Sequence, residues 1–237
     1  MPLVAHNQLP SFNRLRGEGI KVLAPDAAKH QDIRELHIGL LNMMPDAALA
    51  ATERQFFRLI GESNPIAQFY VHPFTLSELP RSEKTQAHIY DYYETFKQIK
   101  QQGLDALIIT GANVVGAEVS NQAFWQPLIC VCYWAHENVT STLCSCLATH
   151  AVLEFRYAQK RVPQTIKKWG VFSHKVTNKF HPMATDINTR FDVPHSRWND
   201  VSKNQFEEVN LNVLAVGDDD DRKSTRMNSS HVALSRM

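Results

Sequence analysis

The chain has 237 residues, of which 43% are hydrophobic and 21% are charged, and its formal net charge is +1. This composition supports a globular core, and a net charge near zero argues against nucleic acid or an anionic membrane surface as the partner. Because the sequence contains neither a secretory leader nor a run of about 18 apolar residues, a soluble, cytoplasmic protein is expected.

The first 110 residues alternate between strand and helix patterns. A strand is predicted over 35–44 and ends at Pro45, because proline interrupts backbone pairing. The pattern then predicts a helix over 47–59, a strand over 66–74, a long helix over 84–101 and a strand over 105–110.

The same alternation continues to residue 216. A helix is predicted over 124–137, a strand over 139–146, a helix over 147–154 and a strand over 211–216. Continuous apolar strands between helices indicate an α/β fold, with a mostly parallel sheet and helices on both faces. Residues 1–217 are interpreted as one such domain.

Residues 218–237 depart from this pattern. An acidic run, Asp218–Asp221, precedes a segment ending at His231 that resembles the translation of a sequencing-adapter oligonucleotide. We interpret 218–237 as a non-native tail and leave it out of the reasoning about the fold, with a genuine polar tail as the alternative. Adjacent acids in such a segment favour a solvated run over a metal site.

The four cysteines form two C-x-C pairs, Cys130 with Cys132 and Cys144 with Cys146. This spacing favours reduced thiols over a disulfide framework or a zinc site, and no metal is predicted. Cys146 lies at a predicted strand-to-helix junction, where the positive helix N-terminus favours a nucleophilic thiolate. A buried structural cysteine is the alternative for Cys146, and Cys144 is interpreted as a core residue.

Several ordered motifs carry a resemblance to a known family. They are Leu41-Asn42-Met43-Met44-Pro45, Thr52-Glu53-Arg54-Gln55-Phe56, Ile109-Thr110-Gly111-Ala112, Trp125, Thr140-Ser141-Thr142-Leu143, Cys146, Gly170-Val171 and Pro194-His195-Ser196-Arg197. Over about residues 1–217 the chain resembles the homoserine O-acyltransferases of the homoserine O-succinyltransferase family. The resemblance implies a class I glutamine amidotransferase-like, flavodoxin-like fold. It also implies acyl transfer from acyl-CoA to the hydroxyl of L-homoserine in methionine biosynthesis.

The resemblance assigns roles to individual residues. Cys146 matches the cysteine that accepts the acyl group, and Lys167 and Ser196 match substrate-binding residues. Val115 matches the position linked to acyl specificity, where glutamate goes with acetyl and glycine with succinyl transfer. Val115 is neither, and succinyl-CoA is expected over acetyl-CoA because valine carries no repelling carboxylate. Arg197 pairs either with a substrate carboxylate or with a structural acid.

Backbone donors are predicted beside the nucleophile. Negative charge developing on the thioester oxygen needs N–H groups, and we expect these from Leu147 at the helix start and from Ala112 in the Gly111-Ala112 turn. No cofactor is expected, because acyl-CoA is itself a substrate. L-homoserine and acyl-CoA are the expected partners, and a homodimer is left open.

The general base is the main departure from the family pattern. The family uses a histidine in a His-Pro-Glu motif, which this sequence lacks; His181-Pro182-Met183 has no glutamate. The catalytic histidine and glutamate are therefore expected beyond residue 237, and the chain is predicted to be an inactive fragment, truncated at its C-terminus. His150, four residues after Cys146, is interpreted as a packed or solvated histidine rather than the base.

Two other function classes are kept open. A glutamine amidotransferase-like cysteine hydrolase would usually carry G-x-C-x-G, whereas the residues here are Cys144-Ser145-Cys146-Leu147-Ala148. A non-catalytic pseudoenzyme is compatible with the missing His-Pro-Glu motif.

Overall fold

The computed structural model describes residues 3–114, 118–217 and 231–235. Its contacts divide the chain into two compact units: the first contains residues up to 114, 122–148 and 232–237, and the second contains 115–121 and 149–231. The single domain expected over 1–217 stays a prediction, and each unit is described by itself below.

A parallel sheet forms the centre of the first unit. Its strands are β1 (Leu3–Val4), β2 (Val22–Leu23), β3 (Glu35–Leu41), β4 (Gln68–Phe74), β5 (Ala106–Ile109), β6 (Ser141–Ser145) and β10 (His231–Ser235), in the order β10-β6-β5-β3-β4-β1-β2. The described pairings among β1, β2, β3, β4, β5 and β6 are all parallel. The central register aligns Leu40 with Ile108 and Ile108 with Leu143, so the predicted parallel sheet is confirmed.

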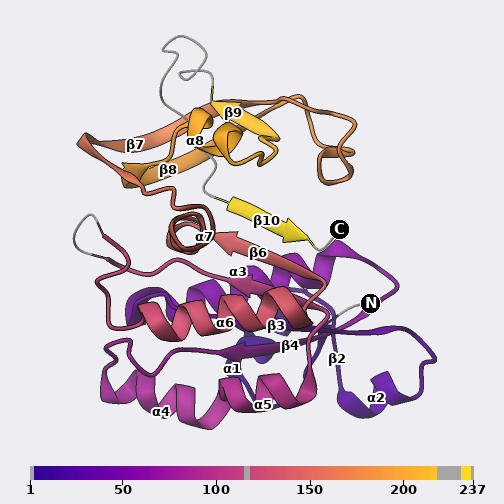
Figure 1. The fold of residues 1–237 in the computed structure, drawn as a ribbon. Coiled ribbons are helices and arrows are strands. Elements are labelled where there is room, and N and C mark those ends of the chain that lie inside the picture. The colour runs from indigo at the N-terminus through magenta and orange to yellow at the C-terminus, as the bar shows by residue number, and fades with distance from the viewer. Residues whose placement is uncertain (1–2, 115–117, 218–230, 236–237) are drawn as a thin grey trace. The chain divides into compact units, whose positions relative to one another are not determined.

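Helices cover both faces of this sheet, as predicted. They are α1 (Pro10–Gly17), α2 (Pro25–Lys29), α3 (Asp46–Ser63), α4 (Glu83–Tyr92), α5 (Phe96–Gln102), α6 (Trp125–Asn138) and α7 (Leu147–Tyr157). Helices α4, α5 and α6 lie on one face, and α1 and α3 pack together on the other (Figure 1). The helix α7 begins in the first unit and continues into the second.

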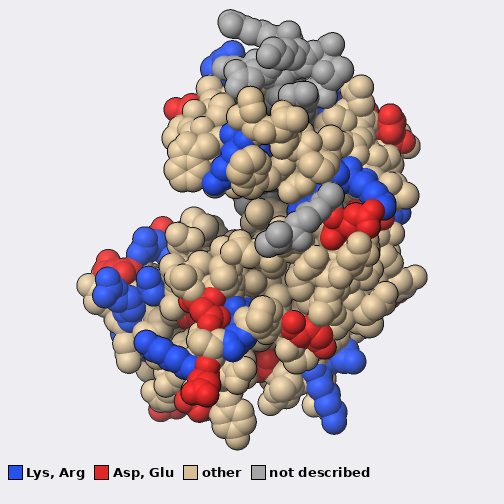
Figure 2. Space-filling model, turned by 90° about the vertical axis from the view of Figure 1, so that its left-hand side faces the viewer, with Lys and Arg blue, Asp and Glu red and all other residues tan. Residues whose placement is uncertain are grey.

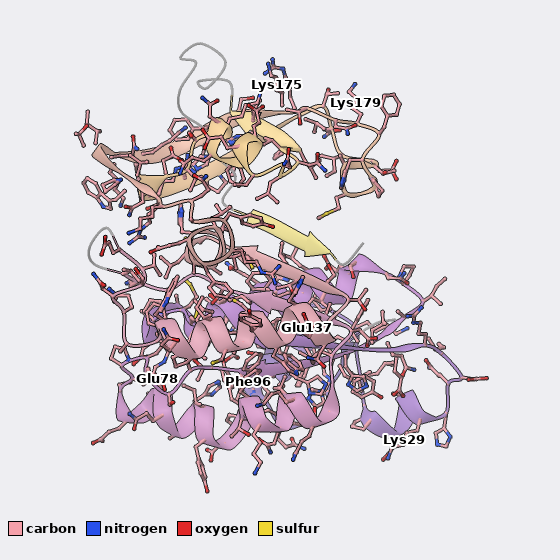
Figure 3. All side chains as sticks on the ribbon, in the orientation of Figure 1. Lys29, Glu78, Phe96, Glu137, Lys175 and Lys179 are labelled. Atoms are coloured by element: carbon pink, nitrogen blue, oxygen red, sulfur yellow. The ribbon has the colours of Figure 1, made fainter. Side chains whose placement is uncertain are left out.

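Apolar side chains fill the space between the helices and the sheet. One buried cluster joins α1 and α3 to β1, β3 and β4, and it includes Leu3, Phe12, Leu40, Phe57, Phe69 and Val71. On the other face, Phe96 at the start of α5 (Figure 3) has its ring centroid 6.0 Å from that of Phe74 and 5.5 Å from that of Trp134 on α6. Burial of this kind, at roughly 25 cal/mol per Å², is the main stabilising term for such layers.

The single long helix predicted over 84–101 is wrong. The chain leaves the helix after Tyr92, the Glu94 amide donates to the Pro73 carbonyl at 2.9 Å, and α5 begins after Thr95. Thr95 and Gln98 form a reciprocal capping box that satisfies the first amides of α5. The break therefore arises from a new helix start and from backbone pairing with the end of β4.

The second unit contains an antiparallel sheet that the sequence patterns did not predict. Its strands are β7 (Val162–Val176), β8 (Arg190–Asp200) and β9 (Ala215–Gly217), in the order β8-β7-β9. The short helices η1 (Pro182–Ala184) and α8 (Lys203–Glu208) belong to the same unit. Of the strand predicted over 211–216, only its end forms β9.

The surface charges and the helices were compared with the features that nucleic acid and membranes require. On the face drawn in Figure 2, basic and acidic side chains lie among one another, as expected for a net charge of +1. Within the described ranges, no helix has the length and apolar character needed to cross a membrane.

Candidate active site

Cys146 lies between the last residue of β6 and the first residue of α7. Its φ is +56°, in the left-handed region that L-residues rarely adopt, at a cost of roughly 1–2 kcal/mol. The side chain of Cys146 is exposed, whereas Cys144 is fully buried, as the core interpretation of Cys144 predicted. The sharp strand-to-helix junction predicted at Cys146 is thus present, and it turns this thiol away from the core.

Gly111 lies directly against the Cys146 thiol. The end of β5 is next to the end of β6, since Ile109 pairs with Cys144. A Cβ atom on Gly111 would lie 3.0 Å from Cys146 Cβ, 3.2 Å from Cys146 Sγ and 3.6 Å from the Leu147 amide nitrogen. Only glycine leaves this space open, and a reacting carbonyl group needs such space beside the sulfur.

The backbone around this space can supply hydrogen-bond donors. Leu147 is the first residue of α7, and the first amides of a helix have no acceptor within the helix. Ala112, which is half-buried, follows Gly111 in the same turn. The structure therefore brings Cys146, Leu147 and the Gly111-Ala112 turn together, as an oxyanion-binding arrangement requires.

Polar groups hold the neighbouring strand end in place. The Thr110 hydroxyl accepts a hydrogen bond from the Met43 amide at 2.8 Å and donates one to the Gly111 carbonyl at 3.1 Å. The Asn42 side chain, which is fully buried, donates to the Leu49 carbonyl at 3.1 Å and to the Tyr93 hydroxyl at 3.0 Å. These bonds fix the carboxyl ends of β3 and β5 beside that of β6, where the sequence placed the site.

A buried carboxylate beneath this edge was not anticipated. Glu53 on α3 is fully buried and accepts from Ser11 Oγ at 2.6 Å, Tyr93 Oη at 2.6 Å and His88 Nε2 at 2.9 Å. Burial, followed by the charge of Glu53, raises the pKa of Tyr93 well above its ordinary value. Glu53 belongs to one of the motifs that carry the family resemblance. Its three partners come from separate segments, so the sequence offers no signal for the hydrogen-bond network.

The three predicted substrate residues lie in the second unit. Lys167 Nζ stacks over the Trp169 ring at 4.7 Å, and Trp169 pairs with Ser196 across β7 and β8. Directly opposed residues share a sheet face, so Trp169 and Ser196 lie on the same face. Lys167 contacts the Trp169 ring and therefore lies on that face too. Arg197 pairs with Lys168 and therefore lies on the opposite face, where its Nη2 is 3.7 Å from Asp200 Oδ2.

Two histidines of the second unit are held in the neutral form. Burial, then Arg161 and Arg197, lowers the pKa of His150 to about 4, and its Nδ1 is buried without a hydrogen-bond partner. Burial, then Arg197 and Lys168, lowers the pKa of His195 to about 3. A pKa this low makes a weak base near neutral pH.

Two predictions fall on residues outside those that the structure describes. Val115, the predicted acyl-specificity position, lies outside them. So does most of the predicted tail, because only 231–235 of residues 218–237 are described.

Comparison with known proteins gives a consistent family signal. Residues 2–230 match the family model for homoserine O-succinyltransferase. The chain is 67% identical over 219 residues to a homoserine O-succinyltransferase of Thiobacillus denitrificans, covering 92% of the chain and 63% of the relative. It is 66% identical over 215 residues to one of Nitrosococcus oceani, covering 91% and 60%.

The relatives are longer than this chain, which spans about three fifths of their length. Among solved structures, a putative GMP synthase protein of Thermoplasma acidophilum matches with a TM-score of 0.48 at 12% identity. That match covers 77% of this chain and 73% of the other.

Proposed function

The chain belongs to the homoserine O-succinyltransferase family, and from this premise we propose that its protein transfers a succinyl group from succinyl-CoA to the hydroxyl oxygen of L-homoserine. The observation that carries the proposal is the Cys146 thiol, exposed in a left-handed turn at the start of α7, with the open space of Gly111 beside its sulfur. The products are O-succinylhomoserine and free CoA, so the reaction belongs to methionine biosynthesis.

The first half-reaction is thioester exchange. The Cys146 sulfur attacks the carbonyl carbon of the acyl-CoA, a new carbon–sulfur bond forms, and the bond to the CoA sulfur breaks. The proton lost by the Cys146 thiol ends on CoA. Because one thioester replaces another, the step is close to isoenergetic and needs no cofactor.

The second half-reaction is ester formation. The homoserine hydroxyl oxygen attacks the acyl carbon on Cys146, its proton passes to a general base, and the base returns that proton to the leaving sulfur. In both steps the carbonyl oxygen becomes negative, and the amides of Leu147 and Ala112 are the proposed donors to it. Removing one such donor from an oxyanion site typically lowers the rate about 10²- to 10³-fold.

The second sheet supplies the proposed substrate contacts. Lys167 and Ser196, which share a face of β7–β8, are assigned to homoserine binding. For Arg197 a structural ion pair with Asp200 is favoured over a substrate contact, because its Nη2 lies 3.7 Å from Asp200 Oδ2 and Arg197 lies on the opposite face from Ser196. A homodimer and a cytoplasmic location stay predictions.

Labelling with radioactive succinyl-CoA tests whether Cys146 is the nucleophile. Incubation with radiolabelled succinyl-CoA should label wild-type protein and Cys144→Ala, which changes a buried core thiol, but not Cys146→Ala. Label that persists in folded Cys146→Ala would end the covalent mechanism.

The acyl donor is tested separately. Val115 lacks a carboxylate that would repel the free carboxylate of succinate, so kcat/KM should be higher for succinyl-CoA than for acetyl-CoA. Since valine is bulkier than the glycine that goes with succinyl transfer, the preference should be modest. A preference for acetyl-CoA of about tenfold or more, equivalent to about 1.4 kcal/mol, would reverse the assignment.

A further inference from the structure

A cluster of histidines and a glutamate lies in the first unit, away from Cys146. His6 follows β1, His72 lies in β4, and Glu94 lies in the break between α4 and α5. The ligand atoms of these three side chains all lie within 4.8 Å of one another. Three strand spacings, roughly 14 Å, separate β4 from β6 in the sheet, so this cluster is distinct from the proposed active site.

The cluster contains buried polar atoms without hydrogen-bond partners. The side chains of His6, His72 and Glu94 are only 17%, 6% and 16% exposed. His6 Nε2 is buried and makes no hydrogen bond, and Glu94 Oε2 is buried without a hydrogen bond of normal geometry, although the Gln102 side chain helps to lower the pKa of the Glu94 carboxyl. Because almost all buried polar atoms in proteins are satisfied, two such atoms in one cluster indicate a missing partner.

The surrounding hydrogen bonds suit metal ligation. His6 Nδ1 faces the Val4 carbonyl at 3.4 Å, so a proton on Nδ1 leaves the Nε2 lone pair free. His72 Nε2 lies 2.9 Å from His37 Nδ1, so a proton on Nε2 leaves His72 Nδ1 free toward Glu94. A metal-binding histidine usually donates its second N–H to such a neighbour, which fixes the ring and its tautomer.

Hydrogen bonds among the side chains alone do not account for every buried polar atom of the cluster. His72 Nδ1 lies 2.5 Å from Glu94 Oε1 and can donate to it, while His37 donates to His72 Nε2. That chain satisfies His37 and His72. It leaves His6 Nε2, 4.0 Å from Glu94 Oε1, without an acceptor or donor.

We propose that His6, His72 and Glu94 form a binding site for a divalent transition metal, with Zn²⁺ as the best match. Two imidazoles and one carboxylate form a ligand set that Zn²⁺ prefers, and water would fill the fourth position. Zinc ligands lie about 2.0–2.2 Å from the metal, so their atoms are roughly 3.3 Å apart. Glu94 Oε1 lies 2.5 Å from His72 Nδ1 and 4.0 Å from His6 Nε2, on either side of that value, and all three ligand atoms lie within 4.8 Å of one another.

The site would tie three separate segments together. It links the segment that follows β1 to strand β4 and to the break between α4 and α5. A metal that binds the folded state alone stabilises it in proportion to ligand concentration. The inferred role is therefore structural and independent of the acyl transfer proposed above.

The test is zinc titration of the purified 237-residue chain, after EDTA dialysis and alkylation of exposed thiols with iodoacetamide. Calorimetry should give one Zn²⁺ per chain, and zinc should raise Tm. His6→Gln and Glu94→Gln should each weaken zinc binding at least tenfold and remove the Tm shift. His136→Gln, which changes an exposed histidine outside the cluster, is the matched control and should bind zinc as the wild type does.

Two outcomes would overturn the site. One is no stoichiometric binding by the folded wild-type chain, and the other is binding that both ligand variants retain. If a variant fails to fold by circular dichroism, the Co²⁺ spectrum of the thiol-blocked wild type decides. Intense d–d bands from nitrogen and oxygen ligands support the site, and their absence or thiolate charge-transfer bands refute it. None of these readouts depends on acyl transfer.

Discussion

Gly111 leaves no room for a methyl group beside the proposed nucleophile. In Gly111→Ala the new Cβ would lie 3.0 Å from Cys146 Cβ and 3.2 Å from Cys146 Sγ, so the thiol or the turn must shift. Misplacement of a reacting group by about 1 Å can cost roughly 10²-fold in rate. We therefore expect the rate of Cys146 acylation to fall about 10²-fold, measured by single-turnover labelling with succinyl-CoA.

A second glycine supplies the control for this substitution. Gly17 at the end of α1 has no atom within 4 Å of its added Cβ, so Gly17→Ala should leave the acylation rate unchanged. Equal acylation rates in Gly111→Ala and the wild type would show that the space beside the sulfur is not used.

His150 gives a pH dependence of stability with a definite sign. Its pKa is 6.5 in the unfolded chain and about 4 in the folded one, chiefly because burial disfavours the charged ring. Below pH 6.5 the unfolded state therefore binds a proton that the folded state does not. The free energy of unfolding should fall as pH drops from 6.5 to 4, by up to about 1.4 kcal/mol per pH unit from this group.

Urea denaturation at several pH values measures this contribution. His150→Gln should flatten the fall in unfolding free energy between pH 6.5 and 4, because the titrating group is gone. His136→Gln removes an exposed histidine and should keep the wild-type slope. The assignment fails if the His150→Gln curve runs parallel to that of the wild type.

At the scale of the elements, the start of α5 depends on one hydroxyl. Thr95 Oγ1 accepts from the Gln98 amide at 3.3 Å, and Gln98 Oε1 accepts from the Thr95 amide at 2.8 Å. Thr95→Ala removes the first bond, and loss of such a cap costs about 1 kcal/mol. Urea denaturation should report this decrease, whereas Gln101→Ala on the exposed side of α5 should stay within about 0.5 kcal/mol of the wild type. Equal decreases in the free energy of unfolding of the two variants would show that the Thr95 cap has no special role.

Some elements could be predicted from the sequence because apolar or β-branched residues run through them. Strand β5 is an unbroken apolar run inside the sheet, and β6 alternates the buried Thr142 and Cys144 with partly buried residues, so the strand-to-helix junction at Cys146 follows. The helix predicted over 84–101 failed because helical spacing continues across Tyr93 and Glu94, although their partners lie on α3 and β4. Strands β7 and β8 were missed because exposed residues interrupt their apolar pattern.

The two candidate sites also differ in whether neighbouring residues in the sequence reveal them. Cys146 carries its signal locally, in the strand that precedes it and the helix that follows. The cluster of His6, His72 and Glu94 has no local signal, because strand pairing brings together residues up to 88 positions apart. Only the folded sheet reveals such a site.

At the scale of the whole molecule, the second sheet exposes large apolar side chains. Ile166, Trp169 and Val171 of β7 are 80%, 72% and 69% exposed. Exposed apolar groups this close in one strand mark an interaction surface or a site of association. Soluble yield is therefore a useful companion measurement for any activity assay on this chain.

The chain alone is expected to accept an acyl group but to turn over slowly. The second half-reaction needs a general base near neutral pKa, and the sequence contains no His-Pro-Glu. His150 and His195 are poor substitutes, because burial lowers their pKa values to about 4 and about 3. Since general base catalysis contributes about 10²- to 10⁴-fold, O-succinylhomoserine formation should be slower by that factor than in a longer relative.

The Thiobacillus denitrificans relative is a suitable reference for this comparison, since it is 67% identical over 219 residues. Both proteins should be labelled by succinyl-CoA, but only the relative should release the label rapidly when homoserine is added. Soluble yield, measured in parallel, separates slow chemistry from loss of folded protein. Equal release rates would show that a base within these 237 residues completes the site, and His150→Gln and His195→Gln would then identify it.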